Sequence, residues 1–258
     1  MSERPKVPLL LVDPQLGRLL PAHRLDAARS ALPVRVARVP QGEWQIGENG
    51  SSEHLGVLLL EGVVSHDVLM GGAASTELLG PGDVLQPWTR EHQPLLRRMI
   101  RWHVLSESRI ALLDRQFSWQ LGSWPEVNAA LMGRMGERAE RLATAQAISK
   151  LTRVDRRVLA FLWHLSERWG RVTAEGVLVP LTLSHRMLGQ IVGARRPTVT
   201  AAVRQLIDAG ELERRPDGSW LLVGQEHNAL ADEDPGPLVP PRRRLLVARD
   251  ASRQREVA

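Results

Sequence analysis

The sequence contains no cysteine. Disulfide bonds, thiolate zinc sites, cysteine-ligated iron–sulfur clusters and thiol redox sensors are therefore excluded. Long hydrophobic runs are also missing, because no stretch approaches the ~20 apolar residues that span a bilayer. The run Leu9–Val12 is too short for the apolar region of a signal peptide and ends at Asp13-Pro14. We expect a cytoplasmic protein with no membrane partner.

The signatures of common enzymes are missing as well. The chain has no Gly-x-Ser-x-Gly motif, no P-loop and no dinucleotide-binding fingerprint. Its eight histidines are scattered, with no His-x-His pair of the kind that a cupin metal site needs and no convincing arrangement for haem. We therefore expect no catalytic activity, no metal and no cofactor.

Lysine is scarce, since only Lys6 and Lys150 stand among the 34 Lys and Arg residues. A high arginine content is expected of GC-rich coding, so the distribution of charge is more informative than its amount. Residues 150–224 contain 12 basic and 7 acidic residues, which accounts for the whole formal net charge of +5. A localised basic segment is typical of a protein that binds a polyanion with salt-dependent affinity.

Residues 183–206, inside this basic segment, predict two short amphipathic helices joined by a turn at Gly193. Ser184 is placed to cap the first helix by accepting hydrogen bonds from free backbone amides. The apolar face of that helix consists of Leu188, Ile191 and Val192. This arrangement is the geometry of a DNA-reading helix-turn-helix.

The second helix is predicted to pack inward through Val199, Val203, Leu206 and Ile207. Pro197 falls in its first turn, where an amide donor has no helical partner. The opposite face presents Arg195, Arg196, Thr198, Thr200, Ala201 and Arg204. Arginines and small hydroxyl residues suit base edges and phosphates. The candidate DNA-binding residues are Ser184, Arg195, Arg196, Thr198, Thr200 and Arg204.

A hairpin is predicted directly after these helices. Gly210 is suited to end the second helix, and Asp217-Gly218 separates two short strand-like runs. With Val154–Trp169 as a preceding helix, this order predicts a winged helix-turn-helix that binds double-stranded DNA. The alternative is an ordinary helical hairpin whose arginines are merely solvated.

The first half of the chain has a different pattern. Short β-like runs are separated by turn residues: Val34–Val39, Leu55–Leu60, Val63–Val64, Val68–Met70, Thr76–Leu79, Met99–Leu105 and Arg109–Leu113. Many short strands at this spacing favour an antiparallel roll or barrel.

Between the two halves, residues 125–150 predict one long helix. Its apolar stripe consists of Val127, Leu131, Met135, Ala139, Leu142, Ala145 and Ile148, and Arg134, Arg138 and Arg141 are assigned to its other faces. A stripe of this length predicts a dimerisation seam, with Val127, Leu131, Met135 and Leu142 as its candidate residues. The stripe could instead pack on the β domain of its own chain, and both can hold.

The predicted fold is therefore α+β. Residues 1–124 form a β-roll sensor-like domain, 125–150 the connecting and dimerisation helix, and 151–224 the winged-helix DNA-binding domain. Residues 225–258, rich in proline and charge, are predicted to be a disordered tail.

The order of roll, long helix and winged helix resembles the Crp/Fnr family of bacterial transcription regulators over roughly residues 30–223. The residues that carry the resemblance are Leu188–Gly193 with Arg196, Thr198 and Val199, and in the roll Glu61–Val64 and Gly80–Leu85. The resemblance implies a cyclic-nucleotide-binding-like roll, a homodimer, RNA polymerase as a partner, and a guanine contact from Arg196. Pro197 and Ala201 depart from the family pattern, so its best-known operator is not carried over.

The roll departs further from the cyclic-nucleotide-binding members. Where those proteins continue into Gly-Glu-Leu, this chain has Gln86-Pro87-Trp88, and Met99 follows Arg97 and Arg98 where a serine is expected. Control by cyclic AMP through the standard cassette is therefore not expected, and Arg97 and Arg98 are weak candidates for binding another effector. The alternative function is a DNA- or partner-binding scaffold whose roll senses no ligand. Operator sequence, activation or repression, and the effector stay open.

Overall fold

The computed structural model describes residues 6–44, 54–88 and 95–224. The predicted tail, residues 225–258, lies outside the described residues. Among the described residues, no helix is both long enough and apolar enough to cross a membrane.

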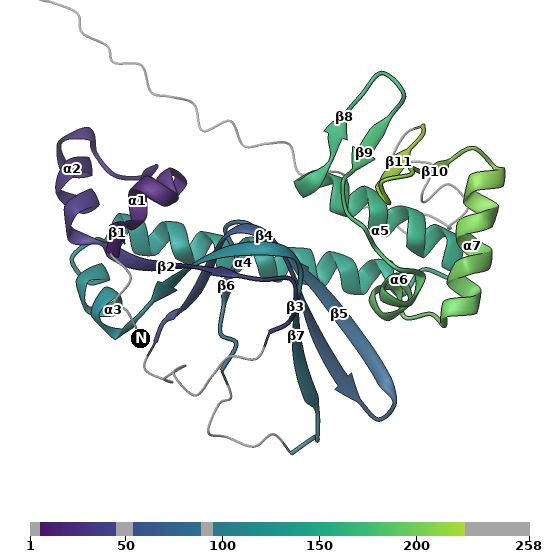
Figure 1. Ribbon diagram of the computed structural model, residues 1–258, viewed down its shortest axis with the longest axis horizontal. Coiled ribbons are helices and arrows are strands. Elements are labelled where there is room, and N and C mark those ends of the chain that lie inside the picture. The colour runs from purple at the N-terminus through teal and green to yellow at the C-terminus, as the bar shows by residue number, and fades with distance from the viewer. Residues whose placement is uncertain (1–5, 45–53, 89–94, 225–258) are drawn as a thin grey trace, which may run out of the picture.

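An antiparallel sheet forms the centre of the N-terminal half (Figure 1). Its strands are β1 (Lys6–Pro8), β2 (Pro33–Val39), β3 (Gly42–Glu43), β4 (Gly56–Met70), β5 (Ala73–Leu79), β6 (Val84–Leu85) and β7 (Met99–Leu113). The main path is β1-β2-β7-β4-β5, with β3 on β7 and β6 on β4. The short runs predicted from 55 to 70 join into β4, with register shifts between Leu59 and Val64. The predicted antiparallel roll is confirmed.

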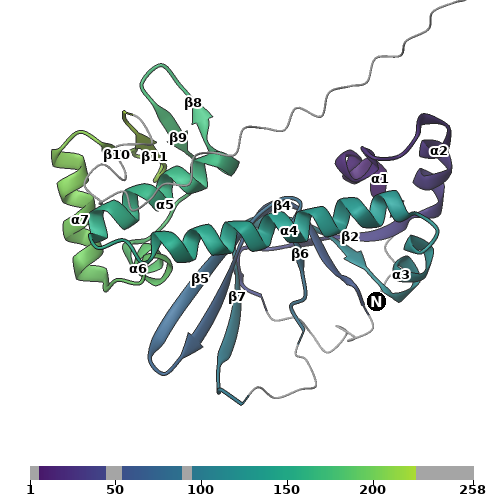
Figure 2. The ribbon, with the colours of Figure 1, turned by 180° about the vertical axis from the view of Figure 1, so that it is seen from behind.

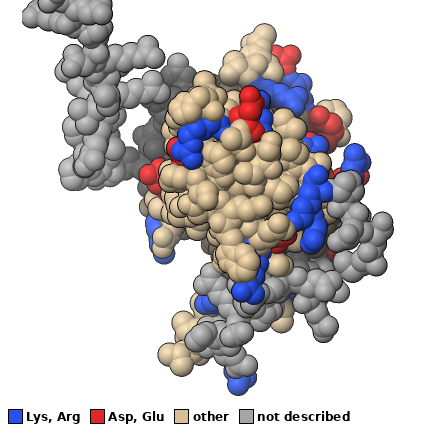
Figure 3. Space-filling model, turned by 90° about the vertical axis from the view of Figure 1, so that its left-hand side faces the viewer, with Lys and Arg blue, Asp and Glu red and all other residues tan. Residues whose placement is uncertain are grey.

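Helices at one end of this sheet were not predicted from the sequence. They are α1 (Leu9–Val12), the 3-10 helix η1 (Pro14–Gly17), α2 (Ala22–Ala31) and α3 (Arg115–Leu121). Leu9, Leu16 and Phe117 are fully buried in the core that these helices share with the sheet. Figure 3 views this end and shows acidic and basic side chains around a large uncharged centre.

Helix α4 (Pro125–Ile148) confirms the predicted long helix and begins at a proline, which suits a first helical turn. Figure 2 shows it crossing the sheet from α3 at one end to α6 at the other. Val127, Ala130 and Leu131 are buried against the N-terminal core. Ala145 and Ile148, near its other end, pack against the core of the C-terminal half.

The arginines of α4 correct the helix pattern drawn from the sequence. Arg134, Arg138 and Arg141 face the rest of the subunit, where they pair with Asp13, Glu77 and Asp83, respectively. In the middle of the predicted apolar stripe, Met135 and Leu142 are instead exposed, at 50% and 43%, while the ends of the stripe pack against the two cores. Paired arginines therefore occupy inward positions that a hydrophobic pattern assigns to apolar residues.

Asp83 joins the two halves of the molecule and is only 3% exposed. Its carboxylate accepts hydrogen bonds from Arg141 of α4, from Arg168 of the next helix at 2.6 Å, and from the Gly80 amide at 2.9 Å. Gly80 also permits close packing between this loop and Trp169, since a Cβ at position 80 would lie 2.7 Å from Trp169 Cζ2. The roll thus contacts the C-terminal half through a buried ionic group.

The C-terminal half has the predicted winged-helix order (Figure 1). Its elements are α5 (Val154–Trp169), β8 (Arg171–Val172), β9 (Val177–Val179), α6 (His185–Val192), α7 (Arg196–Asp208), β10 (Leu212–Arg214) and β11 (Trp220–Leu222). The strands form a sheet in the order β10-β11-β9-β8, of which β8 and β9 were not predicted. A single apolar core, including Phe161, Leu188 and Trp220, supports the helices.

Candidate nucleic-acid interface

The turn between α6 and α7 is built as the sequence predicts. Ser184 caps α6, because its Oγ accepts a hydrogen bond of 3.1 Å from the Met187 amide. Gly193 ends α6 in the left-handed conformation, with φ of 67°. The chain can then turn directly into α7, which starts at Arg196 with Pro197 in its first turn.

Helix α7 buries one face and exposes the other. Val199, Val203 and Leu206 are at most 3% exposed and hold the helix on the domain core. Ile207 was predicted to face inward, but it is 41% exposed, and Ala202 is buried instead. The inward stripe thus follows the 199, 202, 203, 206 spacing, which turns residue 207 past the edge of the core.

The outward face of α7 is formed by the predicted DNA-binding residues Arg195, Arg196, Thr198, Thr200 and Arg204, all exposed or partly exposed. Among the described residues, Arg195 and Arg196 form no ion pair. Arg204 lies 3.8 Å from Asp208 across one helical turn, with both side chains largely in solvent. These guanidinium groups are therefore available to an external polyanion.

His185 is a residue of this surface that the sequence analysis missed. Its Nδ1 lies 2.9 Å from Thr200 Oγ1, so it connects the start of α6 with the exposed face of α7. Burial lowers the pKa of His185 below its ordinary value, and the positive charges of Arg214 and Arg196 lower it further. The only available sequence signal was its position next to the cap residue Ser184.

The wing adds further basic side chains. Arg214 of β10 lies over the ring of the buried Trp220, with 4.4 Å between the guanidinium carbon and the ring centroid. Gly218, with φ of 84°, makes the predicted turn between β10 and β11. Hydrogen bonds from Ser219 lower the pKa of Asp217 in this turn. Arg214 and Arg215 were not selected from the sequence, although they precede the predicted hairpin.

The remaining candidate residues lie away from this surface. Val127 and Leu131 are buried within the subunit, whereas Met135 and Leu142 lie on the exposed side of α4. Arg97 and Arg98 are exposed and precede β7. The structure does not bring these two arginines to the residues that line the cavity described below.

Comparison with known proteins supports the interpretation of the C-terminal half as a helix-turn-helix domain. Residues 156–227 match the family model of the Crp-like helix-turn-helix domain. Among curated proteins, none matches the sequence.

Several solved structures share the fold. FixK2 from Bradyrhizobium japonicum is 17% identical, with 77% of this chain and 96% of that chain covered and a TM-score of 0.59. A CRP-family transcriptional regulator from Thermus thermophilus is 16% identical over 76% and 95% of the chains, with a TM-score of 0.58. A cyclic nucleotide-binding domain-containing protein from Listeria monocytogenes is 15% identical over 81% and 96%, with a TM-score of 0.60. The predicted resemblance to the Crp/Fnr fold is confirmed.

Proposed function

We propose that the protein is a homodimeric, sequence-specific DNA-binding transcription regulator of the Crp/Fnr type, without catalytic activity. Residues 1–124 serve as a sensor-like unit, 125–150 as the dimer helix and 151–224 as the DNA-binding unit. RNA polymerase is the further partner expected of such a regulator, and the cytoplasm is where it would meet DNA. Control by cyclic AMP through the standard cassette is not part of the proposal, since Pro87 removes a phosphate-binding amide.

The observation that carries this proposal is the exposed face of α7. A helix held on a core by Val199 and Val203 presents Arg195 and Arg196 without ion-pair partners among the described residues. An exposed guanidinium group without a carboxylate partner in its own subunit can neutralise a phosphate of a polyanion and release the counterions bound there. Arg196 is proposed to read a base edge, with Thr198 and Thr200 on phosphate or neighbouring positions.

Dimerisation is proposed through the outward side of α4. Val127 and Leu131 already pack inside the subunit, so the seam depends on Met135 and Leu142 together with the neighbouring Met132, which is 47% exposed. Two such subunits would place their α7 helices ~34 Å apart, in successive major grooves of a pseudo-palindromic site.

The DNA-binding part of the proposal is tested by selecting duplexes from a random pool with the wild-type protein. The selected duplex is then titrated with the wild type and with Arg196→Ala. The substitution is expected to cost about 1–3 kcal/mol and to relax specificity at one base position. Arg171→Ala is the matched control, because Arg171 is also exposed in this domain but lies on β8. Unchanged discrimination among operator variants would reject the base-reading role of Arg196.

The dimer is tested with the double substitution Met135→Glu and Leu142→Glu, measured by sedimentation equilibrium. Charged side chains on the exposed seam should yield folded monomers with weakened operator binding. Met70→Glu serves as the control, since Met70 is 48% exposed at the end of β4. A double variant that stays dimeric would place the seam elsewhere.

A further inference from the structure

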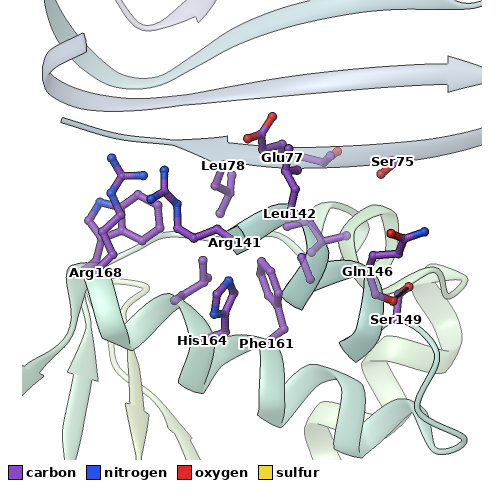
Figure 4. Close-up of a pocket in the computed structure, with 15 residues that line it drawn as sticks. Ser75, Glu77, Leu78, Arg141, Leu142, Gln146, Ser149, Phe161, His164 and Arg168 are labelled. Atoms are coloured by element: carbon purple, nitrogen blue, oxygen red, sulfur yellow. Dashed lines mark hydrogen bonds between the residues drawn. The ribbon is translucent and has the colours of Figure 1, made fainter. Parts of the chain in front are cut away.

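A cavity lies where the roll, the long helix and the DNA-binding half meet (Figure 4). Its volume is about 380 Å³, within the range of sites that hold small molecules. The lining comes from β5, the C-terminal part of α4 and α5, with Ile191 of α6 added. A molecule bound here would contact all of these elements at once.

The charges around the cavity are unequal. Glu77 pairs through both oxygens with Arg138, while Asp83 divides its two oxygens between Arg141 and Arg168. Within this ion-pair cluster, three guanidinium groups share two carboxylates, which leaves one positive charge in excess in the cluster. A third carboxylate, Asp67, accepts a hydrogen bond of 2.6 Å from the lining residue Thr76. Burial tends to raise the pKa of Glu77, but hydrogen bonds from Arg138 and His66 outweigh it, so the pKa is lowered and Glu77 stays ionised. Glu167, beside the cavity residue His164, is 73% exposed to solvent.

The excess charge is accessible at Arg141. Within the described part of the chain, Arg141 donates one hydrogen bond, from Nη2 to Asp83, which leaves its Nε and Nη1 groups available. Its side chain is 30% exposed and lines the cavity. Arg168 uses Nη1 on Asp83 and Nη2 on the Pro81 carbonyl. Figure 4 shows both guanidinium groups at the same end of the cavity.

The rest of the cavity is mixed in character. Phe161 and Leu165 of α5 supply apolar surface, and Gln146 and Ser149 supply neutral hydrogen-bonding groups. Figure 4 shows Gln146 and Ser149 at the end opposite the arginines, with Phe161 between the two ends. A complementary ligand therefore has an acidic group, an apolar body and a neutral polar group.

We propose that this cavity is a binding site for a small amphipathic organic anion. Its acidic group pairs with Arg141 and the neighbouring Arg168, and its apolar body lies against Phe161 and Leu165. Because the site joins β5, α4 and α5, an occupied cavity restrains the DNA-binding half relative to the roll. The site is separate from the exposed face of α7, so its occupation does not depend on the proposed DNA contacts.

The test uses anilinonaphthalene sulfonate, an aromatic anion whose fluorescence rises in apolar surroundings, titrated into the full chain. Saturable binding of one molecule per chain is expected. Arg141→Gln should weaken it roughly tenfold, because a charge-assisted hydrogen bond is lost. Arg141→Lys, which keeps the charge, should retain most of the affinity. Arg171→Gln controls for loss of a positive charge elsewhere in the domain.

A second variant fills the cavity without changing charge. Ala145→Trp places an indole at a lining position and should abolish dye binding, whereas Ala174→Trp in the exposed β8–β9 turn should not. Absence of saturable binding, or binding unchanged in both Ala145→Trp and Arg141→Gln, would overturn the site. Duplex binding is measured on the same proteins to distinguish this failure from failure of the proposed function. If the wild type binds its duplex but shows no saturable dye binding, only the proposal about the cavity is overturned.

Discussion

Helix α4 and helix α7 with its N-cap residue each carry three arginines, and the two helices use them in opposite ways. On α4, Arg134, Arg138 and Arg141 face the subunit and pair with carboxylates. On α7, Arg195 and Arg196 face solvent without ion-pair partners among the described residues. The comparison shows that the role of an arginine is decided by whether the fold brings a carboxylate to it.

The two sets also differ in what removing them should affect. The inward arginines contribute to the stability of the folded chain and to the contact between its halves. The outward arginines contribute to binding of an external partner, and the fold does not depend on them. Substitutions that separate stability from DNA affinity therefore test the comparison directly.

The largest effect is expected for Asp83→Ala. The substitution leaves Arg141 and Arg168 without their shared, nearly buried partner, and breaking such a group costs about 3–5 kcal/mol in free energy of unfolding. Urea unfolding followed by circular dichroism measures it. Asp26→Ala is the control, because the Asp26 side chain is 91% exposed in its pair with Arg29, and should change stability by less than about 0.5 kcal/mol. Equal effects at the two positions would mean that the ion pairs of Asp83 do not stabilise the contact between the two halves.

Sequence patterns were sufficient where the determinants are local. The cap at Ser184, the turn at Gly193 and the Asp217-Gly218 turn each depend on residues within a few positions, and the structure has all three. The inward stripe of α7 was predicted except for Ile207, which is exposed, and Ala202, which is buried. The winged-helix order followed from these local signals.

The same method failed where partners are distant in sequence. Arg134 pairs with Asp13, 121 residues away, and Arg141 with Asp83, 58 residues away. Hydrophobic periodicity treats a charged residue as solvent-facing, so it could not place these arginines on the inner side of α4. The helices of residues 9–31 were also missed. Helix α2 has no strong apolar stripe to reveal it, because it has few strongly apolar residues and Ala28 is its only buried one.

A second prediction compares the effect on stability of removing one arginine from each set. Arg138→Ala removes two hydrogen bonds to Glu77 and should lower the free energy of unfolding by about 2 kcal/mol. Arg196→Ala should change that energy by less than about 0.5 kcal/mol, since Arg196 is exposed. Chemical denaturation of both variants provides the measurement.

The pair can also be replaced rather than broken. Glu77→Leu combined with Arg138→Met removes both charges and should recover most of the stability lost in Arg138→Ala, because no unpaired buried charge is left. A double variant as unstable as Arg138→Ala would show that the pair contributes geometry that apolar contacts cannot replace.

The smallest effect concerns His185, which lies at the boundary between buried and exposed groups. Thr200 Oγ1 donates its hydrogen to the Arg196 carbonyl at 3.0 Å, so His185 Nδ1 must donate to Thr200. The other ring nitrogen, Nε2, is then the site that gains a proton. In the free protein, burial and the positive charges of Arg214 and Arg196 lower the pKa of His185 below the ordinary histidine value, which keeps the ring neutral near pH 7.

DNA phosphates at this surface should raise the pKa of His185, because they offset the charges of Arg214 and Arg196. The complex then binds more protons than the free protein, so duplex affinity rises as pH falls from the raised pKa to the lowered one, by less than tenfold per pH unit for each chain. Fluorescence anisotropy between pH ~5.5 and ~8 measures the slope. His185→Gln should flatten it, whereas His23→Gln on the distant α2 should not. Equal slopes in the wild type and His185→Gln would show that the proton is taken up elsewhere.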